Sequence, residues 1–251
     1  MAQNITSLIA GNWKMNGLRA SILEVEKLAE LLAKGTPPRC TVAICPPATL
    51  LGMINRAAAP AGIVLGAQDC HPAPSGAHTG DLSAPMLADA GAQYVIVGHS
   101  ERRADHGETD DLVRQKAIAV MAAGLTPIIC VGETRAEREA GQADAVVARQ
   151  LQGSVPNQAA EDDVVIAYEP VWAIGTGLTP TLQDIENMHK SIRAQLVKRF
   201  DGRGETTRIL YGGSLKPANA ADILGIPEVN GGLVGGASLL ANDFYAIISA
   251  A

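Results

Sequence analysis

The chain has 251 residues, a length that suits one large domain or two small ones. Its 26 acidic residues outnumber its 20 lysines and arginines, which gives a formal net charge of −6. This balance argues against nucleic acid or an anionic membrane as the main partner, and no apolar run reaches the ~20 residues of a membrane span.

The N-terminus and the cysteines indicate the compartment. The first residues, MAQNITSLIA, lack a basic region followed by a long apolar one, so we expect no signal peptide. The cysteines show no CxxC spacing, and most lie in or beside apolar runs: Cys40, Cys45, Cys70 and Cys130. We therefore predict buried free thiols in a cytoplasmic protein rather than a disulfide framework.

Short apolar runs alternate with longer amphipathic stretches along the whole chain. The runs are apolar throughout rather than alternating, as expected of parallel strands that are covered on both faces. The expected strands are Leu8–Ala10, Val42–Cys45, Ile63–Gly66, Tyr94–Val97, Pro127–Val131, Val164–Tyr168, Arg208–Tyr211 and Gly232–Val234.

The stretches between the strands carry helix signals. Ser21–Lys34 and Pro180–Phe200 are amphipathic, and Thr179 with Pro180 offers an N-cap and a first helical residue for the second. Thr109, followed by two acids, opens another helix. This order predicts an α/β fold, a (β/α)8 barrel with residues 1–251 as a single domain. A doubly wound open sheet is the alternative, but no GxGxxG follows the first strand.

In a (β/α)8 barrel the chemistry lies at the carboxyl ends of the strands, and the first strand is followed by an amide and an ammonium group. In an extended segment, Asn12 and Lys14 point the same way and Trp13 points oppositely. The two polar groups would then share one side of the barrel mouth. The alternative is a surface lysine whose stem covers apolar neighbours.

A histidine and a carboxylate follow the fourth and sixth strands. His99 stands just before an expected helix N-terminus, where the helix dipole disfavours the imidazolium. Glu169 has Tyr168 and Pro170 on either side, and partial desolvation would make it a better base. The alternatives are a hydrogen-bonded structural histidine and a glutamate paired with an arginine.

Glycine pairs follow the seventh and eighth strands. Gly212–Gly213–Ser214 and Gly235–Gly236 would let backbone N–H groups approach a ligand closely, and Ser238 could cap the last helix. The loops at these two places form the usual phosphate site of such barrels. Two flexible turns are the alternative, which weakens because both pairs follow adjacent strands.

Six segments and their spacing resemble the triosephosphate isomerase family: GNWKMN, VIVGHSERR, CVGET, AYEPVWAIGTG, YGGS and LVGGASL. The resemblance runs from Gly11 to Leu239. It implies a TIM barrel that interconverts dihydroxyacetone phosphate and D-glyceraldehyde 3-phosphate through an enediolate, in glycolysis and gluconeogenesis. It implies neither a cofactor nor a metal ion.

The resemblance also implies catalytic roles for matching residues. Glu169 would be the base that moves a proton between adjacent carbons, and His99 the neutral electrophile that polarises the carbonyl. Lys14 would offset negative charge, and Asn12 would hold a substrate oxygen. Glu101 would be an orienting group beside the lysine.

A phosphate site and a lid are implied in the same way. Ser214, Gly235, Gly236 and the lid residue Gly175 would bind the phosphate. Residues 170–172 and 176–178 would be the two hinges of the lid, whose closure excludes water and protects the enediolate.

The stretch Asp69–Asp81 holds one cysteine, two histidines and two aspartates, so a metal site is an alternative there. Proline and glycine dominate the stretch, and no known metal-ligand spacing occurs in it. By the resemblance it is a loop that protrudes into the other subunit of a homodimer. There Thr79 would support the neighbouring subunit's Asn12 and His99.

Other positions depart from the family pattern or lie outside it. Leu178 and Leu240 stand where lysine is common, and Asn230 where aspartate is common, but none is expected to touch the substrate. His106 and His189 are expected to be exposed. Two rivals remain: another phosphate-binding barrel would lack the AYEPVWAIGTG segment, and a catalytically silent homologue should have lost the reactive lysine, histidine or glutamate.

Overall fold

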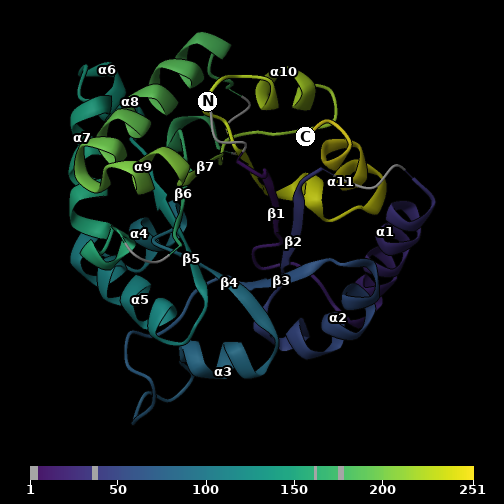
Figure 1. The fold of residues 1–251 in the computed structure, drawn as a ribbon. Coiled ribbons are helices and arrows are strands. Elements are labelled where there is room, and N and C mark those ends of the chain that lie inside the picture. The colour runs from purple at the N-terminus through teal and green to yellow at the C-terminus, as the bar shows by residue number, and fades with distance from the viewer. Residues whose placement is uncertain (1–4, 36–38, 161–162, 175–177) are drawn as a thin grey trace.

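The structure, a computed structural model, is a closed barrel of eight parallel strands (Figure 1). It describes residues 5–35, 39–160, 163–174 and 178–251. The strands are β1 Leu8–Asn12, β2 Thr41–Cys45, β3 Val64–Ala67, β4 Ala92–Val97, β5 Thr126–Val131, β6 Val165–Tyr168, β7 Arg208–Tyr211 and β8 Gly231–Val234. Each strand pairs with the next one in the sequence, and β8 pairs with β1. The predicted strands are confirmed, with ends that differ by at most two residues.

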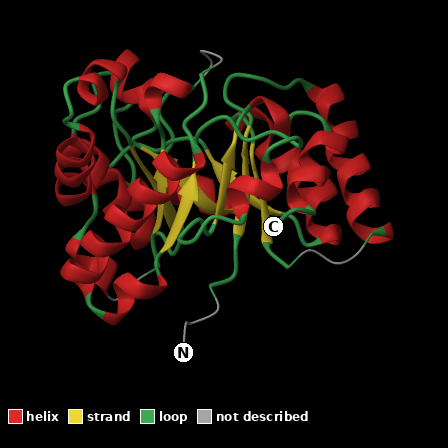
Figure 2. Ribbon diagram, turned by 90° about the horizontal axis from the view of Figure 1, so that it is seen from above, coloured by secondary structure: helices red, strands yellow, loops and turns green. Residues whose placement is uncertain are grey.

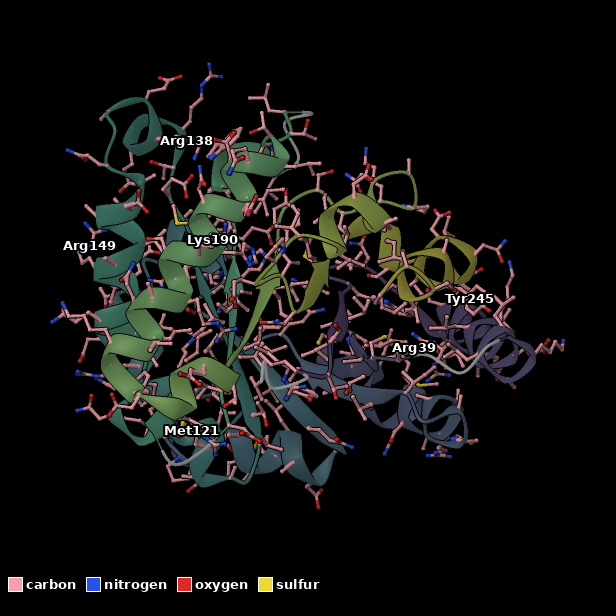
Figure 3. All side chains as sticks on the ribbon, turned by 45° about the horizontal axis from the view of Figure 1, so that its top comes forward. Arg39, Met121, Arg138, Arg149, Lys190 and Tyr245 are labelled. Atoms are coloured by element: carbon pink, nitrogen blue, oxygen red, sulfur yellow. The ribbon has the colours of Figure 1, made fainter. Side chains whose placement is uncertain are left out.

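Helices form a layer around the barrel, as Figure 2 shows from above. They are α1 Ile22–Lys34, α2 Leu51–Ala58, α3 Ala84–Asp89, α4 Ser100–Asp105, α5 Asp110–Ala122, α6 Arg135–Glu139, α7 Ala143–Ser154, α8 Leu182–Phe200, α9 Gly202–Thr206, α10 Ala220–Leu224 and α11 Ala241–Ile248. Charged side chains such as Arg149 on α7 and Lys190 on α8 lie on the outside of this layer (Figure 3). The predicted TIM barrel is therefore confirmed.

Side-chain caps mark the starts of α5 and α8. Thr109 caps α5 as predicted, because its hydroxyl accepts a hydrogen bond from the N–H of Leu112 at 3.2 Å. The start predicted for α8 at Pro180 is wrong. Thr181 is the N-cap there, because it forms a capping box with Asp184.

Ser238 does not cap the last helix, contrary to the prediction. It lies in a short 3-10 helix, Gly236–Ser238, and its hydroxyl donates to the carbonyl of Gly235 at 2.7 Å. The N-cap residue of α11 is Leu240. The serine stabilises the turn after β8 instead, two residues too early to reach the α11 amides.

Alternate strand residues fill two apolar layers. Leu8 and Ala10 of β1 belong to a cluster made of strand side chains, which fills the inside of the barrel. Ile9, which points the opposite way, belongs to a larger cluster that includes helix side chains such as Leu28 of α1. Burying one such leucine or isoleucine stabilises the fold by about 1.5–3 kcal/mol. The rigid double layer holds the strand ends in place.

The cysteine prediction is confirmed, since all four thiols are free and buried. His106 is exposed as expected, but the prediction for His189 is wrong. His189 is 0% exposed and packs from α8 against the rings of Tyr168 and Tyr211. In the part of the chain that the structure describes, no helix combines the length and the apolar character needed to span a membrane.

Candidate active site

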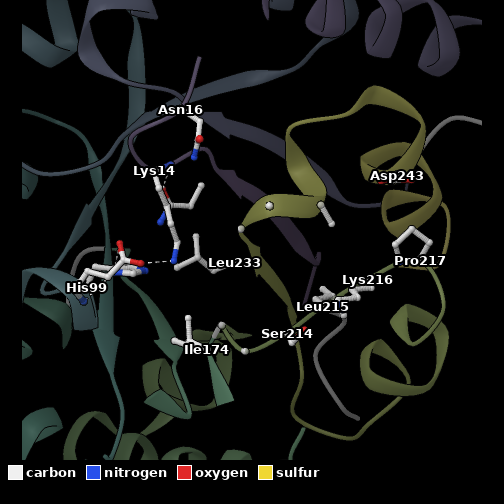
Figure 4. A pocket seen from close by; sticks show the side chains of 17 residues that line it. Lys14, Asn16, His99, Ile174, Ser214, Leu215, Lys216, Pro217, Leu233 and Asp243 are labelled. Carbon is white, nitrogen blue, oxygen red and sulfur yellow. Dashed lines mark hydrogen bonds and ion pairs between the residues drawn. The ribbon is translucent and has the colours of Figure 1, made fainter. Parts of the chain in front are cut away.

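The carboxyl ends of the strands surround a cavity of about 660 Å³ (Figure 4). Its lining includes side chains from opposite ends of the chain. Among the predicted site residues it is lined by Asn12, Lys14, His99, Glu101, Ser214, Gly235 and Gly236. These residues lie at or near the carboxyl ends of different strands, and the barrel brings them together as predicted. Gly175 lies outside the described residues.

The backbone at Lys14 is held in a strained conformation. Its φ is 52°, in the left-handed region that a lysine rarely adopts. The side-chain oxygen of Asn12 accepts from the Lys14 N–H at 3.0 Å, and the amide of Gln68 donates to the Lys14 carbonyl at 2.9 Å. Such strain persists where surrounding contacts enforce it, and it occurs often at functional sites. Gln68 was not among the predicted site residues, although it directly follows β3.

Glu101 forms an ion pair with Lys14, and both side chains line the large cavity. Both side chains are partly open to solvent, at 30% for the lysine and 49% for the glutamate. The carboxylate therefore orients the ammonium group and compensates part of its charge. This contact agrees with the orienting position expected for Glu101.

His99 is the N-cap residue of α4. Its Nδ1 accepts a hydrogen bond from the N–H of Glu101 at 3.2 Å, so Nδ1 carries no proton in this arrangement. The ring proton of the neutral form is then on Nε2. This atom lies 2.9 Å from Oε1 of Glu169.

Glu169 directly follows β6 and is only 1% exposed. Its carboxylate accepts from the backbone N–H of Ser100 at 2.9 Å and from the Ser100 hydroxyl at 3.3 Å. It lines a second cavity of about 230 Å³ rather than the large one. Ser100 was not predicted as the partner of the base, although a serine next to His99 at a helix start can donate both its N–H and its hydroxyl.

The two buried groups shift each other's proton affinity. Burial by itself would raise the pKa of Glu169, but the proton of His99 and the N–H of Ser100 outweigh it and lower that pKa. Burial favours the neutral form of His99, but the Glu169 carboxylate raises the pKa of the ring. The N–H of Glu101 acts in the other direction, because a proton on Nδ1 would break its hydrogen bond. The hydrogen bonds described are those of a neutral ring.

The glycines after β7 and β8 leave space for the side chain of Glu169 and for a ligand, respectively. A Cβ on Gly212 would come within 2.9 Å of Cγ of Glu169, so this glycine accommodates the predicted base. A Cβ on Gly236 would meet nothing within 4 Å, and one on Gly235 only Cε of Lys14 at 3.7 Å. Gly235 and Gly236 therefore leave space in the large cavity for a ligand.

Comparison with known proteins identifies the family. The model of the triosephosphate isomerase family matches residues 7–251. The chain is 60% identical to a triosephosphate isomerase of Afipia carboxidovorans, over 100% of this chain and 99% of the relative. The chain belongs to the triosephosphate isomerase family. It is also 58% identical to a triosephosphate isomerase of Rhodopseudomonas palustris, over 98% of both chains.

A solved structure agrees with this membership. The crystal structure of triosephosphate isomerase from Bartonella henselae superimposes with a TM-score of 0.90 at 44% identity, covering 98% of this chain and 99% of that chain. The chain is therefore an isomerase of the triosephosphate isomerase family, as the sequence motifs predict.

A buried glutamate contacts residues on either side of Glu169, including one in the segment 170–172 that was predicted as a hinge. Glu133 is 0% exposed, and its Oε1 accepts from the Tyr168 hydroxyl at 3.2 Å and from Nε1 of Trp172 at 2.8 Å. The guanidinium of Arg138 lies 4.8 Å from the centre of the Trp172 ring. The glutamate follows β5 within the CVGET segment, so a reading of every strand end would have found it.

The loop Asp69–Asp81 places His71, His78 and Asp81 near one another, with ligand atoms within 4.8 Å. However, Nδ1 of His71 accepts from the N–H of Ala73 at 3.0 Å, so the proton of the neutral ring is on Nε2. Neither ring nitrogen of His71 then offers a free lone pair to a metal ion. This geometry disfavours the metal alternative.

The departures from the family pattern of this isomerase lie away from the large cavity. Leu178 and Leu240 are exposed, and neither lines it. Asn230 accepts from the guanidinium of Arg193 at 2.9 Å, and Glu228 supplies the charge partner of this arginine at 2.7 Å. Asn230 thus accepts a hydrogen bond from Arg193 without contributing a charge.

Proposed function

We propose that the isomerase interconverts dihydroxyacetone phosphate and D-glyceraldehyde 3-phosphate, with Glu169 as the base. The observation that carries the proposal is the meeting of Glu169 and His99 beside a cavity that Lys14 and Asn12 also line. The carboxylate takes a proton from the carbon beside the carbonyl, which leaves an enediolate. The same carboxyl group then returns the proton to the neighbouring carbon.

His99 acts on the oxygens. Its Nε2–H donates to the carbonyl oxygen and stabilises the negative charge that develops there. For the product to form, a proton must also leave one substrate oxygen and reach the other, and Nε2 can give one proton and take one back. The hydrogen bond from Glu101 fixes the ring orientation for this exchange.

The remaining residues bind and orient the substrate. Lys14 offsets the charge of the phosphate and of the enediolate, and Asn12 holds a substrate oxygen. Ser214, Gly235 and Gly236 form the phosphate site, supported by the space beside the two glycines. Gly175 of the lid belongs to the same proposed site.

The proposed reaction needs no cofactor. One substrate carbon is oxidised and its neighbour is reduced, so two proton transfers balance the reaction. Glu169 must leave Ser100 and turn into the large cavity to take part. Gly212 provides the space for this side chain.

An isomerase assay on the purified chain, coupled to consumption of one product, tests this function. We expect interconversion by the wild type and near-complete loss in Glu169→Gln, which keeps the shape but removes the base. Glu186→Gln on α8, a partly exposed residue that does not line the large cavity, is the matched control and should keep full activity. A wild-type chain that does not interconvert the two triose phosphates would contradict the proposal.

We also propose a homodimer through the loop Asp69–Asp81, with Thr79 near the neighbouring active site. Support comes from exposed apolar side chains near this loop and the active site: Met15 is 97% exposed, and Leu82 and Met86 are also exposed. Apolar side chains this open are typical of a surface that a partner covers.

The loop can be shortened without disturbing its base. The N–H of His71 donates to the carbonyl of Leu82 at 2.7 Å, so residues 72–81 leave and return at one place. Replacing them with a short glycine–serine turn keeps Asp69 and its ion pair with Lys116. We expect a folded monomer with little activity, whereas Thr79→Ala should remain a dimer. Sedimentation that shows an intact dimer after the replacement would place the interface elsewhere.

Two further assignments belong to the same proposal. Residues 1–251 form a single domain, supported by one closed barrel whose strands run from Leu8 to Val234. The protein is cytoplasmic, supported by four free buried thiols, which fit a reducing compartment.

A further inference from the structure

The large cavity contains few charges for a site that receives a phosphate dianion. Among the described residues, the ionisable side chains that line it, besides His99, are Lys14, Lys216, Glu101 and Asp243. Lys14 is already paired with Glu101. Lys216 has no ion pair among the described residues, so it is the lining cation whose charge is not compensated by a contact.

The backbone fixes Lys216 next to the proposed phosphate site. Its N–H donates to the side-chain oxygen of Asn219 at 2.8 Å, and the amide of Asn219 donates back to the carbonyl of Ser214 at 3.0 Å. Leu215, which lies between Ser214 and Lys216 in the chain, is buried. Figure 4 places Lys216 on the side of the cavity opposite Lys14.

We propose that Lys216 is a substrate-binding residue that attracts the phosphate end of the triose phosphate and directs it to Ser214. This inference rests on the proposed function. The chain as a whole carries a net charge of −6, which repels an anion, so a local cation is needed to offset it. Lys14 can then act on the reacting oxygens, while Lys216 acts on the phosphate.

Asp243, in the first turn of α11, lies on the same side of the cavity as Lys216 (Figure 4) and has the opposite effect. Its carboxylate reduces the attraction that Lys216 exerts on an anion. The pair therefore sets the balance between capture of the substrate and release of the product. Removing the aspartate charge should strengthen capture, and removing the lysine charge should weaken it.

The test compares Lys216→Gln, Lys216→Arg and the control Lys198→Gln, which removes the same charge from an exposed position near the end of α8. One charge acting on a dianion across about 10 Å of water-like dielectric changes an equilibrium by about fourfold. We expect Lys216→Gln to lower kcat/KM for D-glyceraldehyde 3-phosphate by about that factor at low salt, mainly through KM. Lys216→Arg and Lys198→Gln should match the wild type.

Salt and substrate variants separate this role from a structural one. The loss should shrink between about 0.01 M and 0.15 M ionic strength, because the Debye length falls from about 30 Å to about 8 Å. Turnover of unphosphorylated D-glyceraldehyde should be unchanged in Lys216→Gln, while inhibition by inorganic phosphate should weaken by about fourfold. Asp243→Asn should raise kcat/KM at low salt.

The outcomes decide between clear alternatives. If Lys216→Gln behaves like Lys198→Gln, or lowers turnover of both aldehydes equally, the inference is overturned. If Asp243→Asn fails to raise kcat/KM at low salt, the account of the cavity charge is wrong. An inactive wild type would instead remove the proposed function, so the two failures are distinguishable. Circular dichroism of each variant confirms that the barrel is folded.

Discussion

Nε2 of His99 lies 2.9 Å from Oε1 of Glu169, so the proposed electrophile and the proposed base are hydrogen-bonded to each other. This contact raises the pKa of His99 against the effect of its burial and lowers the pKa of Glu169 against the same effect. A substrate that enters between the two side chains must break the contact. Both pKa values then move in the direction that the reaction needs: the carboxylate becomes more basic, and the ring becomes more firmly neutral.

Glu169→Asp is expected to lower kcat by about 100-fold, because one methylene withdraws the carboxylate by roughly 1 Å from the carbon that it deprotonates. KM should change much less, since the phosphate contacts are untouched. Steady-state kinetics in both reaction directions measure the effect. Glu186→Asp on α8 is the control and should leave kcat unchanged. Wild-type turnover by the Glu169→Asp variant would mean that another residue is the base.

His99 is expected to be neutral at neutral pH, with its proton on Nε2, both in the free enzyme and with an enediolate-mimicking inhibitor bound. Burial of the ring and the hydrogen bond from the Glu101 N–H to Nδ1 favour this form, whereas the Glu169 carboxylate raises the pKa of the ring in the free enzyme. In Glu169→Gln the pKa of His99 should fall, because the carboxylate that raises it is gone. Nitrogen-15 NMR of labelled imidazole across pH measures both the charge state and the shift.

A doubly protonated His99 ring at neutral pH, in either state, would overturn this assignment. A pKa that does not fall in Glu169→Gln would show that the contact between the two residues is absent in solution. Labelled His106, which is exposed, supplies a reference signal in the same spectra.

Much of the site could be predicted because a parallel barrel turns sequence order into spatial order. Asn12, His99, Glu169 and Ser214 are far apart in the chain, but each lies at or just after the carboxyl end of a strand, and these strand ends lie at one rim of the barrel. Knowing the strand ends to within two residues was enough. Gln68 also follows a strand directly, so the same strand-end position identifies it.

Side-chain directions could not be predicted in the same way. That Glu169 would turn to Ser100 rather than into the large cavity depends on competing hydrogen bonds, which strand order does not specify. The burial of His189, by contrast, could have been predicted from the spacing of apolar residues in the sequence. It follows Ile185 by four residues and precedes Leu196 by seven, so it shares the apolar face of α8.

Lys116→Met is expected to destabilise the fold by about 3–5 kcal/mol. The substitution removes one cation from a buried network, so the carboxylates of Asp69 and Glu108 lose the ammonium group that both of them contact. Lys116 is 5% exposed and donates to Asp69 at 2.7 Å and to Glu108 at 2.6 Å. Arg102 alone would then face both acids. Urea unfolding at one fixed protein concentration measures the change, since a dimer makes stability depend on concentration.

The matched control for Lys116→Met is Lys190→Met, which breaks an exposed pair with Glu186 and should change the free energy of unfolding by less than about 1 kcal/mol. Adding Glu108→Gln to Lys116→Met restores the charge balance and should recover part of the loss. Equal stability of the two single variants would show that the buried network contributes nothing beyond a surface pair.

His189 is expected to make the fold less stable as the pH falls from about 6.5 to about 4. The pKa of His189 is lowered from 6.5 to about 4; burial is the main cause and the charge of Arg193 adds to it, while the carbonyl and the carboxylate of Glu228 act in the opposite direction. In this window the unfolded chain takes up a proton that the folded chain refuses. The contribution is therefore fully present above the unfolded pKa and is lost as the pH falls through the folded pKa, to a total of about 3 kcal/mol.

His189→Gln tests this contribution, because the glutamine amide can still donate to the carbonyl of Glu228, which Nδ1 contacts at 3.0 Å, but does not titrate. We expect the free energy of unfolding of the wild type to fall relative to this variant by up to about 3 kcal/mol between pH 7 and pH 4, measured by urea unfolding at half-unit steps. His106→Gln removes an exposed imidazole and should run parallel to the wild type. Parallel curves for the wild type and His189→Gln would mean that His189 takes up its proton in the folded state near its ordinary pKa, which its position beneath Tyr168 and Tyr211 opposes.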